Sequence, residues 1–490
     1  MLKAFERIPL QSSRGGSEGG DFVCVEAWHD PNDGTPSFSK RRLETIELED
    51  WAWQRGQFTP DLSYVNSTNE GARLRILFAQ SKSPFRPIVP SVLVSDKILE
   101  ALQLPRCSFA SYQQPSGVFS SHTYPEGCSV EQCSRLSLVL RTPQKWEMST
   151  GGLIVTHDFE SGMTTALSIG LAFELDKCAS ADGSLQPSPA LGAFFDQIEE
   201  CEHLWGSPLL LPSLFLVAHV QRVRTYIMED LSRRIVAIEQ IVGVTNAGQS
   251  QRRYYEPRTH PAYRDDQKLF VGEHLQRDHA KKLTQTINNL STWIIFTKRS
   301  PYWDIEAVKF IRGILDGSER LRNYRNISAQ AFRETLDYVQ NYSEASLEVT
   351  QTSEERMKLQ LNILYTAVAQ DDGQTSARLA ASAGKDSTSM KIIALITAAY
   401  LPGTFVATLF SMGMFDWRGS SSDSGDGAPM SFVSPNFWIY WTVAIPLTIL
   451  TLIGWATWWR IEERRFVRDI QQAVQDKPSS QSGNGTLEVD

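Results

Sequence analysis

The chain contains little cysteine for its size. Its 490 residues include six cysteines, and all six lie within the first 201 positions. A disulfide scaffold is therefore not expected, because such frameworks occur in short, cysteine-dense secreted domains. Cys128 and Cys133 form a C-x4-C pair, but no second Cys or His pair follows at the spacing of a zinc site. We expect two reduced thiols there.

The chain also lacks the short motifs of common enzymes. It has no glycine-rich phosphate loop and no HExxH zinc motif. His274 and His279 are five residues apart, whereas two metal ligands on one helix face need a step of four. Residues 199–203 (EECEH) have no matching second half and are expected to form a solvated helix turn. We therefore predict neither an enzyme nor a bound cofactor.

Basic charge and an N-terminal apolar run are both missing. The 48 Lys and Arg residues are outnumbered by 56 Asp and Glu residues, which gives a net charge of −8. Nucleic-acid binding needs a basic surface, so no nucleic-acid partner is expected. Residues 1–20 are rich in Gly and Ser and have no apolar core of signal-peptide length. We predict a disordered N-terminus and a soluble part that stays in the cytosol.

Residues 21–205 mix strand and helix signals and predict a cytosolic α/β domain. The expected strands are rich in apolar or β-branched residues and bounded by turn formers; they are residues 73–79, 136–140, 152–157 and 165–173. Residues 206–327 read as mainly helical, with a loop at 246–266. The apolar run 209–217 is too short to cross a bilayer and is expected to begin a buried helix.

Residues 328–390 predict one long stalk helix. This segment has no proline, and apolar residues recur at steps of three and four from Met357 to Val368. Gly373 and Gly384 each weaken a helix by about 1 kcal/mol relative to alanine, so two shorter core helices remain an alternative. A long rod with an apolar stripe needs a partner, which points to self-association.

Two later segments are almost free of charge. Residues 391–415 carry no charge after Lys391, and residues 437–459 carry none at all. Both are long enough to span a bilayer, and aromatic residues crowd both ends of the second segment. We predict two C-terminal transmembrane helices and hence a lipid bilayer around them. Two buried core helices are the rival interpretation.

The distribution of Lys and Arg predicts the orientation of the spans. The intervening residues 416–436 form an acidic loop with one arginine, whereas residues 460–468 carry four arginines. The positive-inside rule then places both termini in the cytosol and the loop outside. Residues 460–490 are expected to form a basic and then disordered tail. An acidic external loop would concentrate cations, although a solvated loop explains the same charges.

The first span carries hydroxyl side chains on one helix face. Thr397, Thr404, Thr408 and Ser411 fall at steps of three, four or seven residues. Such a face offers oxygens to a hydrated ion, and small residues such as Gly403 permit close helix approach. Two spans cannot enclose a pore, so a transporter of this kind must be an oligomer. Packing of two helices is the alternative role for the same residues.

The first span contains the sequence YLPGTFVATLFSM, from Tyr400 to Met412. A long predicted helix precedes it, and a short acidic loop and a second span with a basic tail follow it. Together these features resemble the CorA-type magnesium transporters. The fungal CorA-like branch is particularly similar. The resemblance covers about residues 355–468. It implies a CorA-like fold: an α/β cytosolic domain, long stalk helices and two C-terminal transmembrane helices. It also implies a homopentameric, coiled-coil-like assembly that transports divalent cations, with Mg²⁺ as the expected ion.

The resemblance further implies roles for particular positions. Met390, Ile393 and Leu401 would form apolar gating rings, and Thr404 would form a polar ring, in a pore that Thr408 also lines. The family's Gly-Met-Asn signature falls on Ser411, Met412 and Gly413, so glycine replaces the asparagine. We expect backbone carbonyls, the Ser411 hydroxyl or Asp416 to substitute for that asparagine. The acidic positions expected to hold regulatory divalent ions are Asp371, Asp372 and Asp386.

Two functions follow from these observations. The first is an oligomeric divalent-cation channel, with the plasma membrane as the expected location. The second is a membrane-anchored sensor or scaffold that no longer transports, which the altered signature favours.

Overall fold

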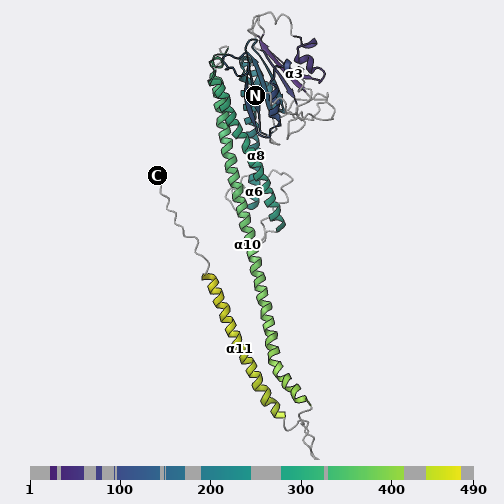
Figure 1. Cartoon of the computed structure of the whole chain (residues 1–490), viewed down its shortest axis with the longest axis vertical. Coiled ribbons are helices and arrows are strands. Elements are labelled where there is room, and N and C mark those ends of the chain that lie inside the picture. The colour runs from purple at the N-terminus through teal and green to yellow at the C-terminus, as the bar shows by residue number, and fades with distance from the viewer. Residues whose placement is uncertain are drawn as a thin grey trace, which may run out of the picture. The chain divides into compact units, whose positions relative to one another are not determined.

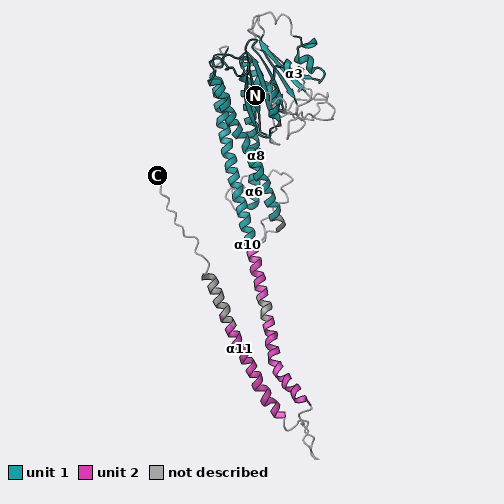
Figure 2. Ribbon diagram, in the orientation of Figure 1, with its two compact units in different colours: residues 1–369 teal, residues 370–490 magenta. Residues whose placement is uncertain are grey.

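The computed structural model describes residues 22–29, 35–59, 73–79, 93, 96–143, 148, 151–170, 189–243, 277–324, 329–412 and 437–475. The predicted loop 246–266, the acidic loop 416–436 and residues 1–20 lie outside this range. The chain divides into two compact units, residues 1–369 and 370–490 (Figure 2). Each unit is described by itself.

Seven strands form one mixed sheet in the first unit (Figure 1). They are β1 (Phe22–His29), β2 (Pro36–Leu43), β3 (Arg73–Ala79), β4 (Val118–Tyr124), β5 (Arg135–Arg141), β6 (Gly152–Asp158) and β7 (Met163–Ile169). Their spatial order is β2-β1-β3-β7-β6-β5-β4. All neighbours are antiparallel except β3 and β7, which run parallel. The strand predictions for β3, β5, β6 and β7 are confirmed, whereas β1, β2 and β4 were not predicted.

Helices cover both faces of this sheet. The α-helices of the described residues are α2 (Leu48–Ala52), α3 (Asp96–Ala101), α4 (Pro189–Glu200), α5 (Leu210–Thr225), α6 (Ser232–Val242), α8 (Arg277–Asp316), α9 (Glu319–Arg322), α10 (Ala329–Ser411) and α11 (Phe437–Gln475). Shorter elements are the 3₁₀ turns η1 (Gly56–Phe58), η4 (Arg106–Gln113) and η5 (Glu202–Leu204), and the π-helical stretch η6 (Tyr226–Leu231).

The alternating side chains of the central strands build two separate cores. On β3, Ile76 and Phe78 face one core and Leu77 faces the other, as the two-residue period of a strand requires. The first core is covered by residues of α4, α5, α8 and α10. The second is covered by α2, α3 and η4. A buried two-sided sheet explains why its inner strands read as continuous apolar runs.

The helices of the first unit also pack on one another. A third core joins α5, η6 and α6 to α8 and α10, with Ile287 and Met357 fully buried within it. The predicted buried helix start at residue 209 is confirmed, because α5 begins at Leu210 and Leu210 is 2% exposed. The helix α10 runs without interruption through Gly373 and Gly384, so the predicted long helix is one element.

A buried ionic cluster joins α5 to α8. His219 Nδ1 lies 2.7 Å from Asp304 Oδ1, and both side chains are 1% exposed. Burial raises the pKa of Asp304, although His219 and Arg222 act in the opposite direction. Burial also lowers the pKa of Arg222 to about 10. Charges buried at this depth need partners, so the cluster fixes how the two helices meet.

A second ionic contact joins α6 to α10. The Arg356 guanidinium donates to both carboxylate oxygens of Glu239, at 2.8 and 2.7 Å. The side chain of Glu239 is 3% exposed and that of Arg356 is 34% exposed. Bidentate pairing compensates the desolvation of the glutamate.

We predict that Arg356→Met destabilises the protein by roughly 2–3 kcal/mol, because it leaves the Glu239 charge buried without its partner. The thermal unfolding of the full chain in detergent would measure the loss. Arg333→Met is the matched control, since Arg333 pairs with Asp316 at 2.7 Å in an exposed position, and exposed pairs contribute at most about 1 kcal/mol. Equal losses in the two variants would contradict the role assigned to Glu239.

Candidate functional site: the exposed face of the first membrane span

Two helices of the second unit have the length and composition of membrane spans. They cover Ser389–Ser411 on α10, with a mean hydropathy of 1.9, and Phe437–Ile461 on α11, with a mean hydropathy of 1.7. Only 11% and 6% of their apolar windows are buried. Helices of a soluble core would be mostly buried, so these surfaces require an apolar solvent. The chain is an integral membrane protein.

One face of the first span packs on the second span. The two helices bury Val406 to 4% exposure and Ala444 to 6%. The hydroxyl of Tyr440 donates to the carbonyl of Gly403 at 3.3 Å. Small residues at such a crossing allow the backbones to approach closely. Buried or half-buried residues of α10 follow steps of three and four on this side, and Ala398 and Gly403 beside them are also half-buried; those in the stripe are Leu395, Ala399, Pro402, Val406 and Phe410.

A cation–π contact joins the start of the first span to the end of the second span. The Lys391 ammonium, at the start of the first span, lies 4.3 Å from the ring centroid of Trp459, near the end of the second. A cation over an indole face at this distance is attracted by the ring quadrupole. The contact therefore sets the register of the two antiparallel helices from the end opposite to Tyr440.

The residues expected to line a pore occupy the opposite face. A helix advances about 100° per residue, so residues at steps of three and four from Met390 form one stripe. The members of this stripe, which we call the open face, are all exposed; they are Met390, Ile393, Thr397, Leu401, Thr404, Thr408 and Ser411. Met390, Ile393 and Leu401 are 73%, 64% and 65% exposed. The open face therefore has no packing partner among the described residues of its own unit.

The hydroxyls of the open face bond to their own helix. Thr397 donates to the carbonyl of Ile393 at 2.9 Å, and Thr404 donates to that of Leu401 at 2.9 Å. Thr408 donates to Phe405 at 2.8 Å, and Ser411 donates to Thr408 at 2.8 Å. A hydroxyl that donates its proton keeps two acceptor lone pairs. These side chains therefore present acceptors, not donors, to whatever lies against the open face.

Pro402 adds a backbone acceptor to the same helix. Proline has no N–H, so the carbonyl of Ala398, four residues earlier, receives no amide hydrogen bond from it. The helix nevertheless continues through Pro402. Membrane helices tolerate such a proline where neighbouring groups compensate the carbonyl.

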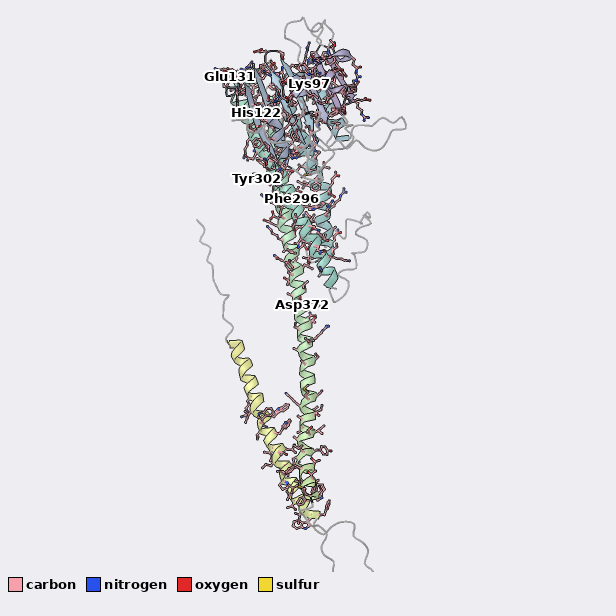
Figure 3. The ribbon with its side chains drawn as sticks, turned by 45° about the vertical axis from the view of Figure 1, so that its right-hand side comes forward. Lys97, His122, Glu131, Phe296, Tyr302 and Asp372 are labelled. Atoms are coloured by element: carbon pink, nitrogen blue, oxygen red, sulfur yellow. The ribbon has the colours of Figure 1, made fainter. Side chains whose placement is uncertain are left out.

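The C-terminal end of the first span and the acidic positions are only partly described. Ser411 is the last residue of α10, and Met412 follows it with 57% exposure. Gly413 and Asp416 lie outside the described residues, as does the side chain of Asp386. Asp371 is half-buried and Asp372 exposed on α10 (Figure 3). No group of three or more potential His, Cys, Asp or Glu metal ligands occurs among the described residues.

The sequence did not predict which residues pair the two spans. It placed Tyr440 in an interfacial belt with Phe437, Trp438 and Trp441, whereas the structure shows its hydroxyl on Gly403. The sequence does contain a signal for this contact: a glycine on one span permits close approach of the helices, and a tyrosine on the other can donate a hydrogen bond to the backbone. It could not be assigned without knowing the register.

Comparisons of sequence give short or no matches. No protein-family model matches the chain. Over 93 residues, or 19% of this chain, the sequence is 34% identical to a protein of Aspergillus versicolor named Notoamide biosynthesis cluster protein M′. The match spans 18% of the length of that relative.

Comparisons with solved structures give distant likenesses. The CorA magnesium transporter of Methanocaldococcus jannaschii is 10% identical with a TM-score of 0.34, covering 88% of this chain and 96% of that one. The ZntB cytoplasmic domain of Vibrio parahaemolyticus RIMD 2210633 is 9% identical with a TM-score of 0.37, covering 71% and 99%. The full-length CmaX protein is 14% identical with a TM-score of 0.31, covering 92% and 100%.

The two faces of the first span predict changes in stability of different size when a residue is replaced by leucine. Gly403→Leu should destabilise the protein by about 1–3 kcal/mol, because the new side chain must displace the Tyr440 hydroxyl; a Cβ at this position already lies 3.7 Å from it. Thr404→Leu, one residue along on the open face, should change stability by less than about 0.5 kcal/mol. Melting temperatures in detergent would measure both. A larger loss for Thr404→Leu would contradict the assignment of the faces.

Proposed function

We propose that this protein is a homo-oligomeric channel for divalent metal cations, with Mg²⁺ as the expected ion, and that the open face of the first span lines its pore. A pentamer is the expected assembly from the sequence resemblance. The observation that carries the proposal is the separation of faces on α10: the side that packs on α11 and the side that bears the hydroxyls are opposite. In this proposal the second span lies behind the first, and the hydroxyl face turns toward the axis of the oligomer.

The composition of the open face supports a water-filled path. Thr397, Thr404, Thr408 and Ser411 lie in line on it and are all exposed. Lipid chains form no hydrogen bonds with such a row, whereas a hydrated ion does. Five copies of each residue around an axis would form rings of hydroxyl oxygens.

The direction of the hydroxyl hydrogen bonds supports cations over anions. Each hydroxyl donates its proton to its own helix, as at Thr404 and Thr408. The lone pairs left to the pore accept hydrogen bonds from water molecules, and the waters of a hydrated cation point their protons outward. Magnesium gives up its waters reluctantly, so rings that bind its hydration shell suit it.

Apolar rings supply the gate in this proposal. Met390, Ile393 and Leu401 extend the open face with exposed apolar side chains. Rings of such side chains close a pore by dewetting when they approach one another. Met390 and Ile393 lie toward the start of the span, so they would form a constriction separate from the threonine rings.

Selectivity and regulation are assigned to the remaining positions. We assign ion selection to the outer end of the span, at Ser411, Met412, Gly413 and Asp416, with backbone carbonyls and the serine hydroxyl replacing an asparagine. We assign regulatory divalent binding to Asp371, Asp372 and Asp386, with further ligands coming from a neighbouring copy. Both termini lie in the cytosol in this proposal, and the plasma membrane is the expected location.

A sensor or scaffold is the second candidate. The glycine in place of the signature asparagine favours it, since that position would otherwise hold a hydrated ion. The same two spans would then serve only as an anchor, and the open face would pack copies together.

We predict that purified protein in liposomes conducts divalent cations and that Thr404→Leu abolishes this flux, because a ring of leucines would dewet the pore. The flux of Mg²⁺ would be compared with that of Ni²⁺, Co²⁺ and K⁺. Thr442→Leu is the matched control, since Thr442 is an exposed threonine of α11 whose hydroxyl donates to Trp438 at 3.0 Å. Its flux should remain within about twofold of the wild type, as for a neutral surface change.

Absence of all flux from folded, oligomeric protein would overturn the channel and leave the sensor or scaffold. Loss of flux in Thr442→Leu but not in Thr404→Leu would overturn the placement of the pore on the first span.

A further inference from the structure

The turn between β4 and β5 contacts the short helix that joins α8 to α10. We call residues 124–134 the cysteine turn; its ends are joined by a hydrogen bond from the amide of Ser134 to the carbonyl of Tyr124 at 2.8 Å. The carboxylate of Glu131, labelled in Figure 3, accepts from the amide of Glu319 at 2.7 Å and from that of Arg320 at 3.3 Å. The turn therefore supplies acceptors for the first amides of α9, which have no partner within the helix.

The contact is reciprocal. The Arg320 guanidinium donates to the carbonyl of Cys133 at 2.8 Å and to that of Glu131 at 3.3 Å. Hydrogen bonds from the Ser318 hydroxyl and from the amides of α9 hold the pKa of Glu131 below its usual range. The carboxylate is therefore charged at neutral pH, as an acceptor at a helix N-terminus should be.

Aromatic residues extend this contact to the sheet. Arg320 also lies over the ring of Phe159, 3.9 Å from its centroid. The Tyr324 hydroxyl and His157 Nε2 are 2.8 Å apart. The junction between the two long helices is thus fixed to β6 and to the cysteine turn by several contacts at once. A change in the turn would act at the point where α8 passes into α10.

The two thiols of the turn are neighbours that face the same core. Cys133 is 1% exposed, and its Sγ–H donates to the carbonyl of Val130 at 3.3 Å. The side chain of Cys128 is half-buried, packs against the same core and lies close enough to Cys133 to raise the pKa of that thiol. Both are free thiols in this structure. A disulfide between them requires the two sulfurs to approach to about 2.05 Å with a Cβ–S–S–Cβ dihedral near 90°.

The two thiols differ in their surroundings. Burial, and then the neighbouring Cys128, raise the pKa of Cys133. The thiolate is the reactive form of cysteine, so the buried Cys133 is the poorer first nucleophile. Cys128 is the more accessible of the two and is the side chain that an oxidant reaches first.

We propose that Cys128 and Cys133 are a reversible oxidation site whose disulfide fixes the cysteine turn on α9. The oxidant class is a hydroperoxide. The Cys128 thiolate attacks the terminal peroxide oxygen and becomes a sulfenic acid while the O–O bond breaks; the departing oxygen takes up a proton and leaves as water from hydrogen peroxide, or as an alcohol from an alkyl hydroperoxide. The Cys133 sulfur then attacks the Cys128 sulfur, the S–OH bond breaks and water leaves. Two thiols are oxidised by two electrons, and one hydroperoxide is reduced.

The expected consequence is a firmer contact with α9. Both thiols belong to one turn closed by the hydrogen bond from Ser134 to Tyr124, so the bond forms within the turn. Glu131 lies between the two cysteines in sequence, and the Cys133 carbonyl accepts from Arg320. Cross-linking the turn restricts the positions of both acceptors. The amides of α9 then open less often, and a thiol reductant such as dithiothreitol restores the original rate.

The test uses the purified full chain in detergent, treated with hydrogen peroxide. Peptide mass spectrometry should find a Cys128–Cys133 disulfide, and deuterium uptake at residues 318–322 should slow at least about threefold, as a modest gain in local stability produces. Cys128→Ser should show neither change, and Cys128→Ala serves if the serine variant does not fold. Cys201→Ser, which alters another half-buried cysteine, should retain both changes.

Two outcomes would overturn the proposal. One is a peroxide-treated wild type in which Cys128 is oxidised without forming a bond to Cys133. The other is a disulfide whose formation leaves the exchange of α9 unchanged or makes it faster.

Discussion

The close crossing of the two membrane helices at Gly403 and Tyr440 determines what the rest of the second unit can do. A helix has one face for each partner, and the contact of α10 with α11 uses the face that contains Val406. Everything on the other side of α10 is left for lipid or for another copy of the chain. Because the hydroxyls and the exposed apolar residues lie on that other side, the crossing also selects which residues can meet at an axis of symmetry. Substitutions at the crossing would therefore change which side of α10 is left uncovered, although they alter no residue of the open face.

The first unit has a different organisation, because its sheet is buried on both sides. Ionisable side chains buried in such a unit are stabilised by hydrogen bonds or ion pairs with other side chains. His219 does so through Asp304 on α8, and Glu239 does so through Arg356 on α10. These pairs contribute less through their own attraction than through the penalty for separating them. They make the packing of α5, α6, α8 and α10 specific, where apolar side chains alone would accept several registers.

The sequence predicted the elements whose environment is uniform along their length. The inner strands β3 and β6 are buried on both faces, so their apolar runs were evident. The edge strands β2 (PSFSKRRL) and β4 (VFSSHTY) are largely exposed or half-exposed, so their sequences resemble loops. The two membrane spans were evident because a segment that crosses a bilayer must be long and free of charge, and that property can be read directly from the sequence. Glycine at Gly373 costs about 1 kcal/mol, which is too little to end a helix of this length.

The candidate site was predictable in part. Steps of three and four along the first span were enough to place Thr397, Thr404, Thr408 and Ser411 on one helix face. The face that packs on α11 was not predictable, because Tyr440 finds Gly403 only in one register of two antiparallel helices. The contacts of the cysteine turn with α9 join residues nearly two hundred positions apart. A spacing rule cannot foresee a pairing of that kind, since no local period links the two segments.

The two cores of the sheet differ in the stretch of chain that each one needs. Among the described residues, the core beneath α2, α3 and η4 ends at Ile169, whereas the opposite core includes Val339 of α10. During synthesis, this opposite core therefore stays incomplete until roughly 10–30 s after the last residue of the other core has been added, at ordinary rates of elongation. Apolar strand surface is exposed for that interval, just before the membrane segments leave the ribosome. The order of residues along the chain thus determines which side of the sheet is completed last.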